Sequence, residues 1–325
     1  MELLVTHETR YRYRPMVEIA QHVAYMRPNQ HAGQQVLQHT FTVLPQPSTL
    51  ISQDDVYGNQ RCFFSLQTPH EELSVRAHSQ VLTQISASVE SDLAWEKVRE
   101  LFRYQAGGLY DAASEFVFAS PFVPRHEEFA SYARPSFSGG ANLLKACIEL
   151  MERMHSDFTY ESHSTQINTP ALQALAQRKG VCQDFAHIMV ACLRSLGLAA
   201  RYVSGYLLTE PPPGEVKLVG SDASHAWASV YLADLPEGAR WVNFDPTNNR
   251  WGWHAPGPDY VTVAVGRDFG DVSPLRGVIH GGASHTLTVG VTVQSAQAVS
   301  RGQSQSQSQS QSGGGTQSQS QSTII

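Results

Sequence analysis

The segment GVCQDFAH, residues 180–187, contains the residue best suited to nucleophilic chemistry. Cys182 follows a glycine and begins a stretch with helical spacing, so we expect it in the first turn of a helix. Unpaired backbone N–H groups and the positive end of the helix dipole favour a thiolate there. The same N–H groups can stabilise an oxyanion formed when the thiolate attacks a carbonyl. The alternative is a small hydrophobic side chain that fills space, which is our interpretation of Cys147 and Cys192.

Two predicted strands could supply a base and a group that orients it: SHAWASVYL, 224–232, and RWVNFDPT, 240–247. A short connection favours an antiparallel hairpin, and side chains alternate between the two faces of each strand. If Leu232 pairs with Arg240, Asp245 lies diagonally from His225 on the same face, roughly 7 Å away at Cβ. The order nucleophile, base and orienting carboxylate is that of a Cys-His-Asp triad.

Each partner has an alternative interpretation. His225 could be a satisfied surface histidine, and Asp245 in Asp-Pro-Thr could merely cap a turn. Order, parity and spacing nevertheless agree with one geometry, which favours the triad.

The elements that must position these residues follow from periodicity. Residues 1–84 read as strands, with a Gly-Asn turn inside VYGNQRCFFSL, and predict an N-terminal antiparallel β domain. Residues 85–298 form the predicted catalytic domain, which begins with helices. Its segment 103–140 could be a long loop, acting as a lid or substrate shelf, or a helical insert. The Gln/Ser-rich segment 299–325 is predicted to be disordered.

Composition narrows the function. The chain has 325 residues, 41% hydrophobic, which excludes wholesale disorder. The formal net charge of −6 and the lack of a basic cluster argue against a nucleic-acid partner. No apolar run approaches the ~20 residues needed to span a membrane. The start, MELLVTHETRYRYRP, has the wrong order of charge and apolar residues for a signal peptide. We therefore expect a cytoplasmic protein.

The metal-binding residue types show no recognisable spacing. Four cysteines contain no CxxC pair, which argues against a disulfide framework, and fourteen histidines are scattered along the chain. No EF-hand-like loop is present. We expect no metal and no cofactor, and keep a zinc site built from scattered histidines as a minor alternative.

Three segments resemble the bacterial transglutaminase-like superfamily: GVCQDFAHIMVACLRSLGLAARYVSGYL, SHAWASVYL and WVNFDPTNNR. The resemblance is dense over 158–268 and weak over the N-terminal β region, and DYVTVAVGRDFGDVSPLRG, 259–277, resembles the tail segment of the family. It implies an α+β, papain-like catalytic domain, in which a helix carrying the cysteine packs on an antiparallel sheet.

The resemblance also implies roles. Cys182 would be the nucleophile, His225 the base and then the acid, and Asp245 the orienting group. The backbone N–H of Cys182 would form part of the oxyanion hole, and these residues do not identify the second donor. We interpret Asp184 as structural and His187 as outside the chemistry.

Aromatic residues near these motifs are candidates for binding substrate. They are Tyr160, Trp227 and Trp251. Core packing would explain Tyr160 and Trp251 equally well.

A thiolate that attacks a carboxamide forms a thioester and releases an amine or ammonia. Water then makes the protein a hydrolase, and an amine makes it a transamidase. We expect a thiol enzyme that cleaves or transfers amide or isopeptide bonds of a peptide or protein, with hydrolysis favoured because water is always available. The alternative is a catalytically silent peptide-binding or scaffold protein of the same fold. The sequence does not determine the oligomeric state.

Overall fold

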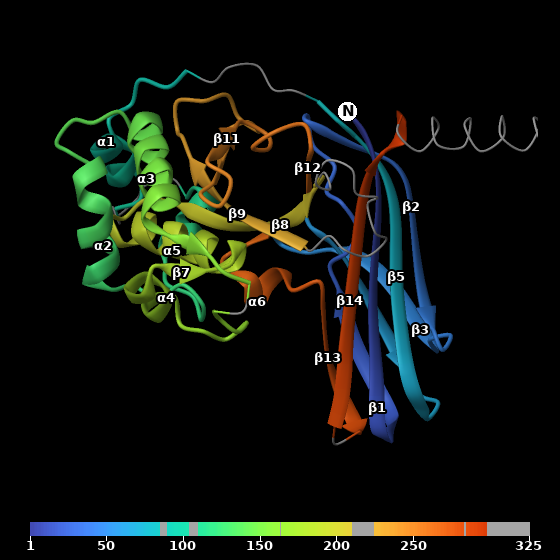
Figure 1. The fold of residues 1–325 in the computed structure, drawn as a ribbon. Helices are drawn as coiled ribbons and strands as arrows, with labels where there is room; N and C mark the ends of the chain where they lie inside the picture. Colours follow the sequence, from blue (N-terminus) through green and yellow to red (C-terminus); the bar gives the residue numbers. More distant parts are fainter. Residues whose placement is uncertain (85–89, 104–109, 163, 210–223, 283, 298–325) are drawn as a thin grey trace, which may run out of the picture.

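The computed structural model describes residues 1–84, 90–103, 110–162, 164–209, 224–282 and 284–297. Five strands precede the first helix: β1 (Glu2–Ala24), β2 (Gln34–Leu44), β3 (Thr49–Asp54), β4 (Gln60–Leu66) and β5 (His70–Thr83). They pair in the order β2-β5-β1-β4-β3. The predicted N-terminal antiparallel sheet is therefore confirmed (Figure 1).

This sheet also receives the last two described strands of the chain, β13 (Leu275–Gly281) and β14 (Ser284–Ser295). They run antiparallel along β1, β13 beside its second half and β14 beside its first half (Figure 1). The predicted unit 85–298 includes these residues, although their strand partner β1 belongs to the predicted N-terminal unit. The partner lies more than 250 residues away in the chain, so local periodicity does not reveal the pairing.

Most of the described helices follow β5 in the chain and precede the strands of the second sheet. They are α1 (Trp95–Leu101), the 3₁₀ turn η1 (Ala112–Val117), α2 (Glu127–Ala133), the 3₁₀ turn η2 (Arg134–Ser136), α3 (Leu143–Asp157), α4 (Ala171–Gln177) and α5 (Cys182–Ser195). The described part of segment 103–140 is thus a helical insert. Phe129 and Ala133 of α2 are buried in the same core as α3 and α5.

The second sheet has five antiparallel strands in the order β11-β10-β9-β8-β12: β8 (Ala200–Leu207), β9 (Ser224–Tyr231), β10 (Trp241–Asp245), β11 (Arg250–Gly252) and β12 (Tyr260–Gly266). Two short strands, β6 (Thr159–Tyr160) and β7 (Lys179–Gly180), pair in parallel just before α5, and α6 (Phe269–Val272) follows β12. Helix α5 packs on this sheet, and its apolar residues share one core with Ala200, Ala228, Val230, Val242 and Phe244.

The two sheets meet in an apolar interface at the N-terminal end of β1. Leu3 and Val5 of β1 lie in one cluster with Tyr202 and Tyr206 of β8, and Cys182 packs against this cluster. Tyr206 also forms a 2.8 Å hydrogen bond with Nδ1 of the buried His7. The N-terminal sheet therefore supports the end of α5 that carries the cysteine.

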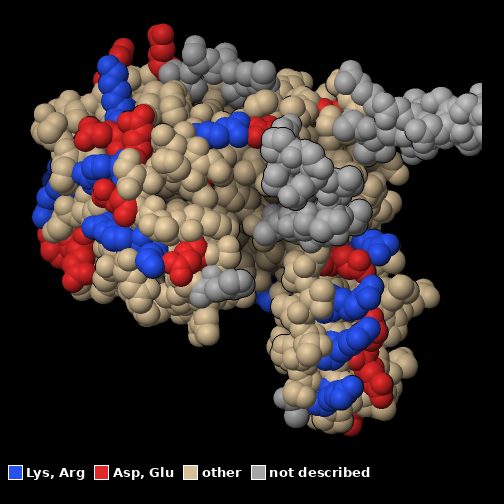
Figure 2. Space-filling model, in the orientation of Figure 1, with Lys and Arg blue, Asp and Glu red and all other residues tan. Residues whose placement is uncertain are grey.

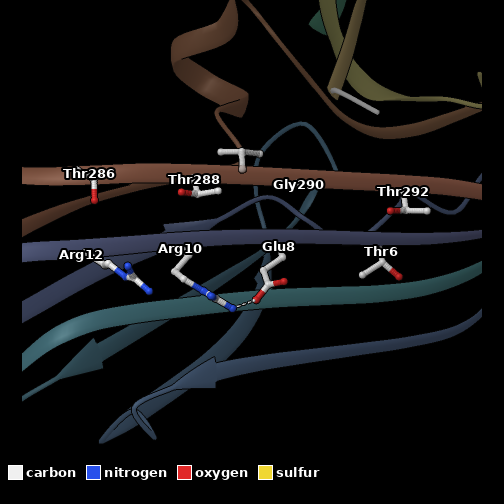
Figure 3. A pocket seen from close by; sticks show the side chains of 9 residues that line it. Thr6, Glu8, Arg10, Arg12, Thr286, Thr288, Gly290 and Thr292 are labelled. Carbon is white, nitrogen blue, oxygen red and sulfur yellow. Dashed lines mark hydrogen bonds and ion pairs between the residues drawn. The ribbon is translucent and has the colours of Figure 1, made fainter. Parts of the chain in front are cut away.

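The opposite face of β1 and β14 is polar. Figure 3 shows Glu8, Arg10 and Arg12 beside Thr286 and Thr288 in an open pocket of about 470 Å³. Ion pairs join Glu8, Arg10 and Arg12 of β1 to Glu72 and Arg76 of β5, and basic and acidic side chains lie side by side on this part of the surface (Figure 2). No sequence-predicted site residue lines this pocket. Among the described helices, none is long and apolar enough to cross a membrane.

Burial of His22 predicts a sensitivity to acid. His22 is buried against Phe64, and neither ring nitrogen has a hydrogen-bond partner among the described residues. Burial and the neighbouring His70 lower the pKa of His22 to about 4. Between about pH 6.5 and 4, His22 is therefore protonated in the unfolded chain but not in the folded protein. This lowers the free energy of unfolding by up to about 3 kcal/mol at the lower pH.

We expect His22→Phe to make the loss of stability between pH 6.5 and 4 shallower by about one proton. Urea unfolding at several pH values measures this slope, and His280→Gln, at an exposed position, is the control. An unchanged slope in His22→Phe would contradict the assignment.

Candidate active site

Cys182 is the first residue of α5, as predicted. Asp184, two residues later, is 3% exposed, and its carboxylate accepts hydrogen bonds from the Val181 N–H (2.9 Å) and the Thr165 hydroxyl (2.6 Å). This contact satisfies one of the free N–H groups at the start of the helix. A Cβ at Gly180 would lie 2.6 Å from the Asp184 carboxylate, so the glycine makes room for it. Asp184 is structural, as the sequence analysis inferred.

The hairpin of β9 and β10 has the predicted register. The Leu232 N–H donates to the Arg240 carbonyl (2.7 Å), and Asn243 lies opposite Ser229. This register makes Asp245 the diagonal neighbour of His225. Nε2 of His225 lies 2.7 Å from Oδ2 of Asp245, with His225 9% exposed and Asp245 fully buried.

The thiol completes the group. The Cys182 thiol is one of the groups that raise the pKa of His225, and its Sγ lies 4.0 Å from the carbonyl oxygen of Ser224, the residue before His225. Because Nε2 of His225 is engaged by Asp245, Nδ1 is the ring nitrogen that remains for the thiol. Helix α5 and two neighbouring strands thus bring together the three residues selected from sequence.

Electrostatics favour a charged imidazole. Burial alone lowers the pKa of His225, but the hydrogen bonds to Asp245 and Cys182 and their negative charges outweigh it and raise the pKa to about 10. Burial likewise raises the pKa of Asp245, and its hydrogen bonds from His225, Asn248 and Tyr260 reverse this and bring the pKa below its ordinary value. The arrangement therefore favours an imidazolium beside an ionised aspartate.

Sequence reasoning missed two residues that contact Asp245. The Asn248 amide and the Tyr260 hydroxyl each donate to Oδ2 at 2.7 Å, and the Asn248 amide nitrogen is 3.3 Å from Nε2 of His225. Both residues lie in segments that carried the family resemblance, DPTNNR and DYVTV. That was the available signal, but nothing local placed Tyr260 beside Asp245.

The two tryptophan candidates for binding substrate lie in the protein interior. Trp227 is fully buried, its Nε1 donates to Asn243 (3.0 Å), and the lack of a side chain at Gly205 accommodates the indole. The prediction that Trp227 binds substrate is therefore corrected. Trp251 is partly buried and stacks on Phe244 in the core.

Tyr160 is the aromatic candidate that lies at the site surface. It is 53% exposed and pairs with Gly180, two residues before the cysteine. Burial of its ring and the nearby Cys182 charge raise the pKa of Tyr160. Tyr160 thus remains a candidate for contact with substrate.

The other thiols and His187 do not join the site. Cys147 and Cys192 are buried, and burial raises the pKa of the Cys192 thiol to about 12. His187 is buried, accepts a hydrogen bond from the Phe269 N–H (3.1 Å), and has its pKa lowered to about 4, chiefly by burial. In the described part of the chain, no three His, Cys, Asp or Glu side chains gather in a way that could hold a metal ion.

Loss of the Asp184 contacts should loosen the start of α5. We expect Asp184→Ala to lower the free energy of unfolding by about 1–2 kcal/mol and to slow alkylation of Cys182. Asp184→Asn, which keeps an acceptor oxygen, should lose less. Denaturant unfolding and alkylation rates measure both effects. Glu149→Ala, an exposed carboxylate in α3, is the control, and equal effects in Glu149→Ala and Asp184→Ala would refute the capping role.

Comparison with known proteins agrees with this architecture. A family model for the bacterial transglutaminase-like N-terminal region matches residues 3–82, and one for the transglutaminase-like superfamily matches residues 130–246. An uncharacterized protein of Mycobacterium tuberculosis is 37% identical over 281 residues, covering 85% of this chain and 87% of the relative. One from Mycobacterium leprae is 29% identical, covering 89% and 97%.

A solved structure has the same fold. It is a candidate cysteine protease from Cytophaga hutchinsonii, 20% identical, which superposes with a TM-score of 0.68 over 91% of each chain. The chain belongs to the transglutaminase-like superfamily and carries the N-terminal region found with its bacterial members.

Proposed function

We propose that the protein is a thiol enzyme that hydrolyses or transfers amide or isopeptide bonds of a peptide or protein. The observation that carries the proposal is the grouping of Cys182, at a helix N-terminus, with the hydrogen-bonded pair of His225 and Asp245, which raises the pKa of the imidazole. These are the parts that covalent catalysis by a thiolate requires.

The reaction proceeds through a thioester. The Cys182 thiolate attacks the carbonyl carbon of the substrate amide, and the backbone N–H of Cys182 donates to the oxyanion. His225 gives its Nδ1 proton to the leaving nitrogen as the C–N bond breaks, which releases an amine or ammonia. Water or an amine then attacks the thioester, its proton passes to His225, and the C–S bond breaks.

Asp245 keeps the imidazole ready for both steps. Its hydrogen bond to Nε2 fixes the ring so that Nδ1 faces the thiol, and its charge stabilises the imidazolium. The triad serves water and amines alike, because the acceptor depends on water exclusion and on an acceptor groove. We favour hydrolysis, since a dedicated amine acceptor is an additional requirement.

Alkylation by iodoacetamide tests the thiolate without any substrate. At pH 6 we expect Cys182 to be carboxamidomethylated rapidly, because the imidazolium beside it favours the anion. Cys147 and Cys192 are buried controls within the same molecule and should remain unmodified in the folded protein. Peptide mapping by mass spectrometry gives the rate for each cysteine. If Cys182 reacts no faster than a free thiol at this pH, the thiolate–imidazolium pair is refuted.

Turnover is tested with a peptide mixture and a primary amine probe, comparing wild type with Cys182→Ala by mass spectrometry. Peptides that gain the probe only with wild type identify a transamidase. Cleaved or deamidated peptides without the probe identify a hydrolase, which is the result we expect. If Cys182 is reactive but wild type and variant leave identical mixtures across broad peptide sets, the silent scaffold becomes the better description.

A further inference from the structure

The segments DPTNNR and DYVTV meet at the carboxylate of Asp245, although 15 residues separate Asp245 from Tyr260. Tyr260 of β12 is fully buried, and its hydroxyl reaches Oδ2 of Asp245 at 2.7 Å. Burial and the charge of Asp245 raise the pKa of Tyr260, so the hydroxyl keeps its proton and acts as the donor.

Oδ2 of Asp245 accepts three hydrogen bonds. It accepts from Nε2 of His225, from the Asn248 amide and from the Tyr260 hydroxyl, each at 2.7 Å. Oδ1 accepts from the backbone N–H groups of Thr247 (2.9 Å) and Asn248 (3.4 Å). The carboxylate is therefore held by the turn that follows it, and the Tyr260 hydroxyl competes with the imidazole for the same oxygen.

The Tyr260 ring is itself held in place. The Arg250 guanidinium lies 4.8 Å from the ring centroid and forms a two-pronged ion pair with Asp259, with both N–O distances 2.6 Å. A Cβ at Gly257 would lie 1.9 Å from an Arg250 nitrogen, so the chain is shaped around this ion pair. A planar, doubly bonded guanidinium has little freedom to move, and the stacked ring shares that restriction.

We propose that Tyr260 is a positioning residue that sets the strength and direction of the Asp245–His225 hydrogen bond, with Arg250 and Asp259 as its brace. This inference rests on the proposed function. Its physical basis is that three donors share the charge of one carboxylate oxygen, so each receives less of it. Among the described residues, the charged and titratable groups around His225 are Asp245 from β10, Cys182 from α5, Tyr260 from β12, and the Arg250–Asp259 pair next to them.

The consequence has a definite sign. Removing the Tyr260 hydroxyl leaves Asp245 held by Asn248 and the Thr247 N–H but frees charge on Oδ2 for the imidazolium. The pKa of His225 should therefore rise, and the Nε2–H hydrogen bond should strengthen. A tyrosine that merely fills space would change neither property.

The experiment is an NMR titration of His225 in protein labelled with ¹⁵N-histidine, made in the Cys182→Ala background so that thiol titration does not interfere. In Tyr260→Phe we expect the midpoint to rise by roughly one unit and the Nε2–H resonance to move downfield. Arg250→Lys, which loses the two-pronged pair, should move both in the same direction by less. An unchanged or lower midpoint in Tyr260→Phe overturns the proposal.

Tyr231→Phe is the matched control. Tyr231 lies on the same strand as His225 and donates to a carboxylate in the same way, to Asp111 at 2.6 Å. Its loss should leave the His225 titration unchanged, and an equal shift would reveal a non-specific effect and overturn the proposal. Alkylation of Cys182 in the wild type separates the two hypotheses. Slow alkylation of Cys182 refutes the proposed function. Rapid alkylation of Cys182 together with an unchanged His225 titration midpoint in Tyr260→Phe refutes this inference alone.

Discussion

The burial of the Asp245 carboxylate is the constraint on which the site depends. A fully buried anion is strongly destabilising unless donors surround it, and breaking such an arrangement typically costs about 3–5 kcal/mol. Asp245 meets this requirement with five hydrogen bonds that come from strand β9, from the turn after β10 and from strand β12, which lies beyond β8 at the edge of the sheet. The donors that surround the Asp245 carboxylate keep it ionised, and its negative charge in turn helps to raise the pKa of His225.

The same constraint explains the shape of the segment after β10. The chain must turn at once so that the Thr247 and Asn248 N–H groups face the carboxylate, and Asn249 adopts a left-handed conformation (φ 52°) within this turn. The chain then returns as β11 and places Arg250 over the ring of Tyr260. Within the motif DPTNNR, Thr247 and Asn248 thus donate hydrogen bonds to Asp245.

The cysteine depends on a second support. Helix α5 is buried along most of its length, but its first residue lies between the five-stranded sheet and the N-terminal sheet. Strands from both ends of the chain, β1 and β14, contribute Leu3, Val5, Val291 and Val293 to the apolar cluster under Cys182. The N-terminal sheet is thus part of the scaffold of the site. Burial of this apolar surface stabilises the contact between the N-terminal sheet and the first residue of α5.

Features encoded within a few residues were predictable from sequence. The start of α5 at Cys182, the parity that puts His225 and Asp245 on one face, and the hairpin register all follow from local spacing, because a strand alternates with period two and a glycine followed by an apolar run marks a helix start. The family resemblance supplied the roles of these residues.

The tertiary structure alone decided the rest. It buried Trp227 against Gly205, returned β13 and β14 to β1, and brought Tyr260 to the carboxylate. The last two of these features join residues on strands whose order in the sheet differs from their order in the chain. Periodicity tells which face a side chain occupies but not which strand lies beside it, so the proximity of His225 and Asp245 was readable in the sequence and the contact of Tyr260 with Asp245 was not.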